Sequence, residues 1–425
     1  MRQKWMYIFL FLLANVAVFY ITPIMFSFNA AKFPLFYFIL RFFLLILSLC
    51  LLPIIFMDKV KDAKNKLKSG LLSLIIMFLI LYYVVESVFT FYPETNGKND
   101  TYCAKTWMFY YWNLNKYGFR DVEFTTMSPN KPNIVFVGDS YTEGHGIKDP
   151  NDRVSNICRQ SFPNFNVYNI GKNGMDINDE IDLLKHIPIH PQIIVLQICS
   201  NDWDYLSKSE SLLPSRSRYL LAASTSFSFA KYSILFNYLD SKLKNIMEKF
   251  FSSKLEDDDI SQIYNEFKID KSASIKSKNS LSVIEYAVDH SKLPQDSIQF
   301  HFFKLFRNFN SSLKAMTDSV LFSDYLNKLN ELKKYCDDQQ TELIVMPYPN
   351  MDKFSMTVGN RYTNPYLCSL IKKQNINCVD VYTNLKSAKL SSYTVNSSDN
   401  HINTKASKIV ANTLILYIRK NILKE

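Results

Sequence analysis

The chain has 425 residues, of which 48% are hydrophobic, and a formal net charge of +10. The first 92 residues hold nine Lys/Arg and three Asp/Glu, so only +4 of that charge belongs to the remainder, where no compact basic stripe argues for nucleic-acid binding. Seven cysteines are too few for a disulfide scaffold, and no Cys/His spacing is typical of a metal site. Cys368 and Cys378 are the closest cysteine pair and therefore a candidate disulfide.

Three long apolar stretches open the chain, at residues 5–26, 34–57 and 71–92. Each is long enough to cross a hydrocarbon layer of about 30 Å, which predicts three transmembrane helices in a membrane anchor at 1–92. Because Arg2 and Lys4 precede the first stretch, a cleaved signal peptide is the alternative there. The lysines of the 58–69 connection and the basic amino terminus predict that both of these segments lie in the cytoplasm. With three crossings, everything after about residue 93 is then expected outside the cytoplasm.

Two of these stretches contain a single charged residue, Arg41 in the second and Glu86 in the third. In the predicted orientation both lie at a similar depth below the outer membrane surface. Charges inside a membrane are expensive, so the two are a candidate ion pair. The alternative is that Arg41 extends to the outer headgroups and Glu86 lies at the interface.

After an expected linker at 93–130, strand-like and helix-like patterns alternate. The expected strands are 134–138, 166–170, 193–199, 342–346 and 377–381. The expected helices are 152–161, 178–186, 321–338, 365–373 and 404–423. This alternation predicts an α/β fold with a doubly wound parallel sheet between two helical layers, in a domain at 131–425. A segment at about 206–320 interrupts the pattern and is expected to be a largely helical insertion.

The run from Ile134 to Gly144 has the pattern of a short buried strand followed by a tight turn. Its apolar residues fit a parallel strand covered on both faces, and Gly138 permits a sharp exit that presents Ser140 at the strand's carboxyl end. The chemistry of α/β folds occurs at that edge. An ordinary loop or helix cap is the alternative reading. Thr142 stands where a Gly-x-Ser-x-Gly elbow would need glycine, so the α/β-hydrolase motif is absent.

Near the other end of the chain, Asp399 and His401 precede the last helical pattern. They are two residues apart, so in an extended segment both side chains point to the same side. A serine nucleophile needs a neighbouring base, and the base needs a group that fixes its tautomer. Ser140, His401 and Asp399 supply these three roles.

Residues 138–142, Gly-Asp-Ser-Tyr-Thr, resemble the nucleophile block of the SGNH (GDSL) hydrolase superfamily. Residues 115–121 are similar to a lead-in of one membrane-anchored bacterial branch. Residues 169–174 resemble the family's glycine block, and residues 199–202 resemble its asparagine block. The resemblance implies that the Ser140 and Gly174 amides and the Asn201 side chain form an oxyanion hole. It also implies a three-layer α/β/α fold with no cofactor and no metal.

The resemblance and the predicted topology imply a multi-pass protein of the cytoplasmic membrane with a periplasmic or extracellular catalytic domain. The expected activity is that of a serine esterase or O-acyltransferase acting on acyl groups, acetyl above all, of a cell-envelope glycan. Expected partners are an ester-bearing glycan or lipid substrate and an envelope-polysaccharide modification partner. The alternatives are a lipase or esterase on lipids or small esters, and a catalytically silent assembly partner of an envelope-polysaccharide system.

Overall fold

The computed structural model describes residues 2–18, 35–61, 66–91, 93–95, 101–199, 202, 233, 235–239, 257–269, 280–294, 297–298, 302, 319–349, 351, 359–385, 392–396 and 399–425. The chain forms two compact units, residues 1–113 with 220–247 and residues 114–219 with 248–425. The domain boundaries expected from the sequence stay predictions.

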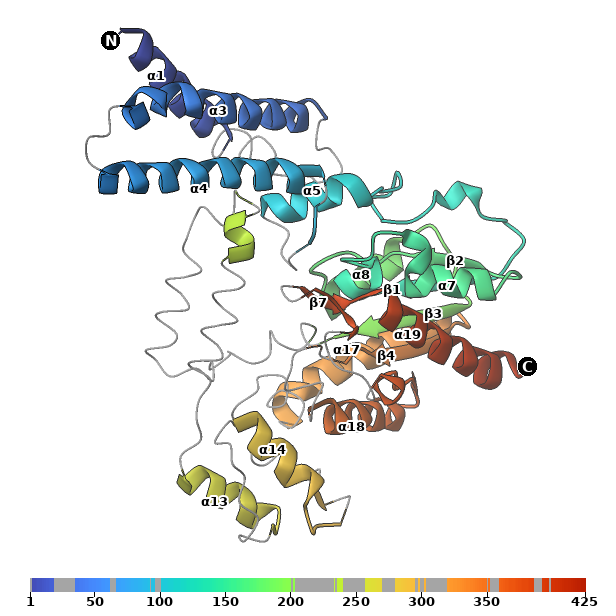
Figure 1. Cartoon of the computed structure of the whole chain (residues 1–425). Coiled ribbons are helices and arrows are strands. Elements are labelled where there is room, and N and C mark those ends of the chain that lie inside the picture. Colours follow the sequence, from blue (N-terminus) through green and yellow to red (C-terminus); the bar gives the residue numbers. More distant parts are fainter. Residues whose placement is uncertain are drawn as a thin grey trace. The chain divides into compact units, whose positions relative to one another are not determined.

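The first unit is built from long apolar helices. They are α1 (Arg2–Val16), α3 (Leu35–Lys61), α4 (Lys66–Phe91) and the shorter α5 (Tyr102–Tyr111), of which α1, α3 and α4 are blue in Figure 1. Two segments, Ile39–Phe56 and Gly70–Val88, are long and apolar enough to cross a membrane. Large apolar side chains such as Phe43 and Leu74 are exposed on them, as a lipid-facing surface requires. The first expected span lies only partly within the described residues.

Arg41 and Glu86 meet inside this unit. Arg41 Nη2 lies 3.6 Å from Glu86 Oε2, and both side chains are fully buried. Arg41 Nη1 also donates to the Val18 carbonyl at 2.8 Å, while Glu86 Oε1 accepts from the Ser233 hydroxyl and from the Leu235 amide. Of the two sequence interpretations, the structure therefore has the ion pair, stabilised by further hydrogen bonds.

The second unit contains a five-stranded parallel sheet in the order β2-β1-β3-β4-β5. Its strands are β1 (Asn133–Val137), β2 (Asn166–Asn169), β3 (Ile193–Ile198), β4 (Glu342–Pro347) and β5 (Asn377–Cys378). All six residues of β3 are buried, as expected for a central parallel strand with helices on both faces. The α/β class and the parallel sheet predicted from the sequence are confirmed.

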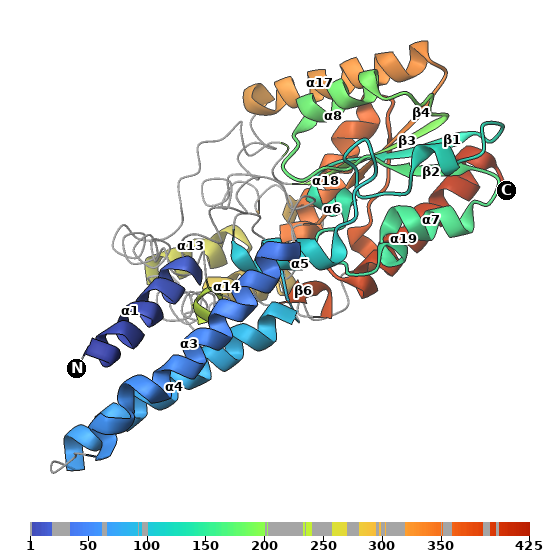
Figure 2. The same cartoon turned by 90° about the horizontal axis from the view of Figure 1, so that it is seen from above.

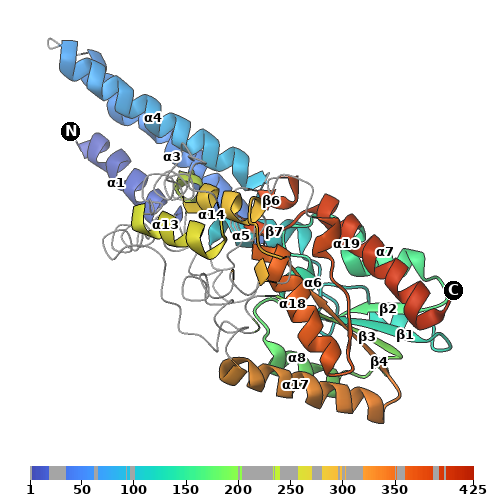
Figure 3. The same ribbon diagram turned by 90° about the horizontal axis from the view of Figure 1, so that it is seen from below.

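Alternate residues of β1 face two separate cores. Val135 and Val137 pack in one core with the helices α8 (Ile177–His186), α17 (Ser319–Asp338) and α18 (Asn360–Lys373), whereas Ile134 and Phe136 pack in the other with α7 (Val154–Ser161) and α19 (Thr404–Tyr417). Figures 2 and 3 show α8 and α17 on one side of the sheet and α7 and α19 on the other. Two helices of the expected insertion, α13 (Asp257–Glu266) and α14 (Ser280–Asp289), extend the first core.

Several boundaries differ from the sequence prediction. β5 ends at Cys378 rather than near 381, because the chain turns into a short 3-10 helix at Tyr382–Asn384, where the Asp380 carboxylate accepts the Tyr382 amide at 2.9 Å. The last α-helix ends at Tyr417 and continues as a π-type turn. A two-stranded antiparallel sheet that the sequence did not predict, β6 (Thr394–Asn396) with β7 (Asp399–Ile402), precedes that helix.

Cys368 on α18 and Cys378 on β5 form a disulfide, with their Cα atoms 5.5 Å apart. The link joins a helix to the edge strand of the parallel sheet at a point where both residues are buried. The closest cysteine pair of the sequence is thus the bonded one.

Candidate active site

Ser140 lies in a tight turn between β1 and the short helix α6 (Ser140–Glu143). Gly138, at φ +153°, makes the turn possible: a Cβ there would lie 2.8 Å from the Gln197 carbonyl and would overlap the Thr142 hydroxyl. The Asp139 side chain caps α6 by accepting the Tyr141 amide at 3.0 Å. Ser140 is therefore held at the carboxyl end of β1, where the sequence placed it.

The structure brings Ser140 together with His401 and Asp399. His401 Nε2 lies 2.8 Å from Ser140 Oγ, and His401 Nδ1 lies 2.6 Å from Asp399 Oδ1. The same Asp399 oxygen accepts the His401 backbone amide at 3.0 Å. Because β7 is extended, Asp399 and His401 project to one side of the strand. The Tyr141 ring packs on the His401 ring with centroids 4.8 Å apart and restrains its orientation.

The Asp399 side chain is fully buried, yet its carboxyl favours the charged form. Burial raises the pKa of its carboxyl, but the hydrogen bond from His401 and the charge of that ring outweigh it, so the pKa is lowered overall. A carboxylate next to Nδ1 keeps the proton on that nitrogen and leaves Nε2 free to accept the serine proton.

The loop expected to supply the second oxyanion donor is hydrogen-bonded to the turn that carries Ser140. The Lys172 amide donates to the Gly138 carbonyl at 3.0 Å, and the Asn173 amide donates to Glu143 Oε2 at 2.7 Å. Gly174 follows at once, with φ +79°. Asn201, the third expected donor, lies outside the described residues.

A group of buried acidic side chains lies close to the turn. Asp139 Oδ2 is 3.1 Å from the Cys199 thiol at the end of β3, and the Cys199 amide donates to Asp202 Oδ2 at 2.7 Å. Glu180 of α8 is fully buried, and neither of its carboxyl oxygens has a hydrogen-bond partner among the described residues. Burial, and then the charges of Asp202 and Asp139, raise the pKa of Glu180 well above its usual value, which favours its neutral form.

Sequence analysis missed a second histidine in the site. His145 is fully buried, and its Nε2 lies 3.7 Å from Asp399 Oδ2. Its ring centroid is 4.6 Å from that of His401. Burial, and then the neighbouring His401, lower the pKa of His145 to about 4, so the ring is neutral at neutral pH. The signal in the sequence was a histidine between two glycines, five residues after Ser140.

His145, Asp399 and His401 also form the one group of His, Cys, Asp and Glu side chains, among the described residues, whose ligand atoms are close enough to share a metal ion. Both nitrogens of His401 are already engaged, one with Asp399 and the other with Ser140. The arrangement fits proton transfer between serine and histidine, and we assign no metal to it.

No family model matches the chain, and no curated protein matches it either. Similar solved structures include a lipolytic protein of the G-D-S-L family from Veillonella parvula, with 13% identity over 69% of this chain and 99% of that one and a TM-score of 0.30. An extracellular lipase from Streptomyces rimosus has 10% identity over 67% of this chain and 98% of its own, with a TM-score of 0.32. An acetylxylan esterase from Geobacillus stearothermophilus has 12% identity over 68% and 94%, with a TM-score of 0.31. These likenesses are distant, and the function proposed below rests on the site's own residues.

Proposed function

We propose that this chain is a membrane-anchored serine esterase or O-acyltransferase that uses Ser140 as its nucleophile. The observation that carries the proposal is the continuous contact from Ser140 Oγ to His401 Nε2, at 2.8 Å, and from His401 Nδ1 to Asp399 Oδ1, at 2.6 Å. Three residues from opposite ends of the sheet domain meet in the geometry that activates a hydroxyl.

In the proposed reaction, Ser140 Oγ attacks the ester carbonyl while its proton passes to His401 Nε2. Asp399 stabilises the imidazolium that forms. The oxyanion of the tetrahedral intermediate is bound by the amides of Ser140 and Gly174 and by Asn201, the donors that the family resemblance implies, and each such donor is worth about 3 to 4 kcal/mol. His401 then protonates the leaving alcohol. Water or a sugar hydroxyl, deprotonated by the same ring, attacks the acyl carbon; its bond to Ser140 Oγ then breaks, and the ring returns the proton to Oγ.

The proposed substrate is an ester-linked acyl group, acetyl above all, on a cell-envelope glycan. This rests on the proposed location, with three transmembrane helices and the catalytic unit outside the cytoplasm. The lysine-rich 58–69 connection supports that orientation. The disulfide between Cys368 and Cys378 supports it too, because such bonds persist in oxidising compartments.

The activity is tested with the full chain and p-nitrophenyl acetate. Ser140→Ala should abolish turnover and labelling by a fluorophosphonate probe, because only the attacking oxygen is removed. Ser128→Ala is the matched control, since Ser128 contacts Asn166 through its backbone. Equal turnover in wild type and Ser140→Ala would reject the serine mechanism, and a wild type that neither turns over nor labels would favour a silent assembly partner. Adding a candidate sugar acceptor separates transfer from hydrolysis.

The location is tested with reporter fusions in the full chain. A reporter that is active only outside the cytoplasm should be active when fused after residue 95 and silent when fused within residues 60–68. The reverse pattern would place the catalytic unit in the cytoplasm and would remove the envelope glycan as its substrate.

A further inference from the structure

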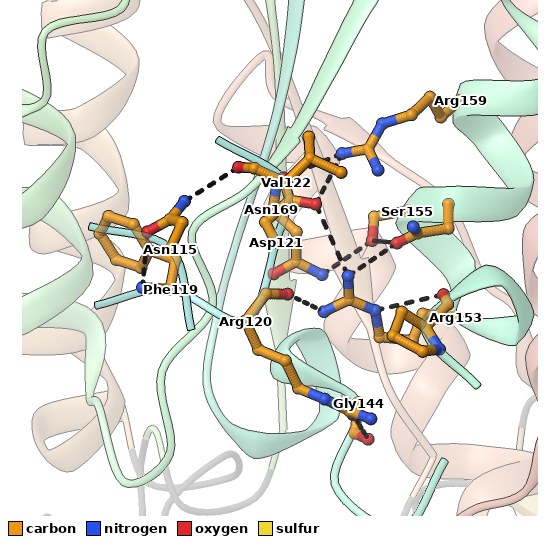
Figure 4. Close-up of polar contacts among 12 residues, drawn as sticks. Asn115, Phe119, Arg120, Asp121, Val122, Gly144, Arg153, Ser155, Arg159 and Asn169 are labelled. Atoms are coloured by element: carbon orange, nitrogen blue, oxygen red, sulfur yellow. Dashed lines mark hydrogen bonds and ion pairs between the residues drawn. The ribbon is translucent and has the colours of Figure 1, made fainter. Parts of the chain in front are cut away.

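Residues 115–121, which we call the strap, form a compact turn near the start of the unit that contains Ser140, about a dozen residues before β1. Asn115 organises it: its Oδ1 accepts the Tyr117 and Phe119 amides at 3.0 and 3.1 Å, and its Nδ2 donates to the Val122 carbonyl at 3.1 Å. Figure 4 shows Asn115 and Phe119 at the left and the Arg120 side chain extending away from them toward Gly144. The turn directs Arg120 and Asp121 into the protein.

The Arg120 side chain binds the backbone of the loop at residues 143–148, which begins at the end of α6. Its guanidinium donates to the Gly144 and Ile147 carbonyls, both at 2.6 Å, and its side chain is almost completely buried. Contacts to the Glu143 and Lys148 carbonyls, at 3.5 and 3.4 Å, complete a ring of backbone oxygens around the charge. Burial, and then the charge of Arg153, lower the pKa of Arg120 to about 9, which still leaves it charged at neutral pH. A charged donor among carbonyl dipoles fixes the backbone of residues 143–148.

Asp121 joins the strap to α7 and to the end of β2. Arg159 Nη2 donates to both of its carboxylate oxygens, at 2.7 and 2.9 Å, and the Asn169 amide donates to Oδ2 at 2.8 Å. Arg153 also donates to the Arg120 carbonyl, as Figure 4 shows. Asn169 ends β2, just before the loop that carries Gly174. Two consecutive strap residues therefore hold the two loops that flank the nucleophile.

The loop held by Arg120 reaches the His401 and Asp399 side of the site at two points. A Cβ at Gly146 would overlap the Val395 side chain of β6, so the loop packs directly on the β6–β7 hairpin. His145, one residue earlier, has its Nε2 3.7 Å from Asp399 Oδ2, an oxygen with no hydrogen-bond partner among the described residues. Its ring also packs on that of His401.

We propose that the 143–148 loop, held by Arg120 of the strap, is a positioning element of the active site, with His145 as the residue through which it fixes the Asp399 carboxylate and the His401 ring. The proposal rests on the proposed serine mechanism. Arg120 and His145 are positioning residues: they touch neither the substrate nor the attacking oxygen, and they act by holding Asp399 and His401 in line with Ser140.

The test uses full-chain variants and measures kcat and KM for p-nitrophenyl acetate, the rate of fluorophosphonate labelling, and thermal unfolding. Arg120→Ala should lower kcat and the labelling rate by about 100-fold, the loss expected when reacting groups move by about 1 Å, with KM little changed. Arg120→Lys should recover part of the loss, because it keeps a positively charged donor. The recovery should be incomplete, because one ammonium cannot reach both carbonyls in the geometry of the guanidinium. His145→Ala should also lower kcat at unchanged KM. His145→Gln, which keeps a donor near the Nε2 position, should retain more activity than His145→Phe, which keeps only the ring.

Arg419→Ala is the matched control, because Arg419, in the turn after α19, also donates to a backbone carbonyl, that of Ser161, but in an exposed position. It should keep wild-type kcat. The proposal is overturned if Arg120→Lys and the three His145 variants all label at the wild-type rate per folded molecule, even where melting temperatures fall. If Arg120→Ala does not fold, Arg120→Lys and the His145 variants alone test the positioning role. An inactive wild type would instead reject the serine mechanism itself, so the two failures are distinguishable.

Discussion

Replacing Asp399 by Asn tests the charge of the carboxylate while keeping its shape. Asp399 Oδ1 accepts from His401 Nδ1 at 2.6 Å and from the His401 amide at 3.0 Å, in a fully buried position. If an amide NH₂ faces the ring, Nδ1 must become the acceptor and the ring proton moves to Nε2. That nitrogen, 2.8 Å from Ser140 Oγ, would then donate to the serine instead of accepting its proton.

The expected loss is large because both orientations of the amide impair the reaction. With the amide oxygen toward the ring the tautomer survives, but the imidazolium formed during attack no longer faces a negative charge. Loss of the carboxylate in such a triad lowers kcat by about 10⁴-fold. At 1.36 kcal/mol for each factor of ten, this is about 5.4 kcal/mol of transition-state stabilisation. KM should change little, because the interaction strengthens only in the transition state.

The assay is steady-state hydrolysis of p-nitrophenyl acetate at neutral pH with wild type, Asp399→Asn, His401→Ala and the double variant. Asp380→Asn is the matched control: Asp380 Oδ1 accepts the amide two residues on, at 2.9 Å, as Asp399 does, but no histidine lies there. The double variant should be scarcely slower than His401→Ala, because the residues act as one unit. Near-normal kcat in Asp399→Asn beside an inactive His401→Ala would refute the reasoning and leave a Ser-His dyad.

Three further predictions concern stability. Glu180→Gln should raise the melting temperature at pH 8 and change it little at pH 4. The pKa of the Glu180 carboxyl is raised in the folded protein, so ionising this buried group destabilises the fold as the pH rises above the unfolded pKa. An equal shift at both pH values would contradict this. Cys368→Ser should lower the free energy of unfolding in denaturant by about 2.7 kcal/mol, the chain-entropy value for a bond that closes ten residues, and an unchanged midpoint would show that the bond contributes nothing. Arg41→Gln and Glu86→Gln should each lower the amount of protein in the membrane more than the double variant does, because each leaves one buried charge beside a neutral side chain. Immunoblots of membrane fractions measure this, and a double variant at the level of the worse single one would argue against the pair.

The parallel sheet could be predicted from the sequence, because a strand that is buried on both faces is a continuous run of apolar residues. β3 is six consecutive buried residues, and the expected strand at 193–199 exceeds it by one. The pairing of Asp399 with His401 followed from the two-residue period of extended chain. Ser140 was located by the strand, the glycine and the turn together.

Other elements depend on tertiary contacts that leave no local pattern. The helix expected at 365–373 begins earlier in the structure, because α18 starts at Asn360, where buried Tyr362 and the Asn364 bond to the Pro347 carbonyl stabilise its first turns. β6 is three residues long and has no alternation to detect. The sequence does not predict that Arg120 is buried, because an arginine is normally exposed unless groups from distant parts of the chain pair with it.

The position of the β6–β7 hairpin separates the site into two preassembled parts. Asp399 and His401 lie on one four-residue strand outside the parallel sheet, whereas Ser140 begins α6 directly after β1 of that sheet. The histidine and its carboxylate therefore move as one unit, and a displacement of the hairpin would separate them from Ser140, Tyr141 and His145 while their own contact stays intact. In the proposed mechanism, the distance between Ser140 Oγ and His401 Nε2 is therefore set by how the hairpin packs on the parallel-sheet domain, whereas the distance between His401 and Asp399 is set within one strand.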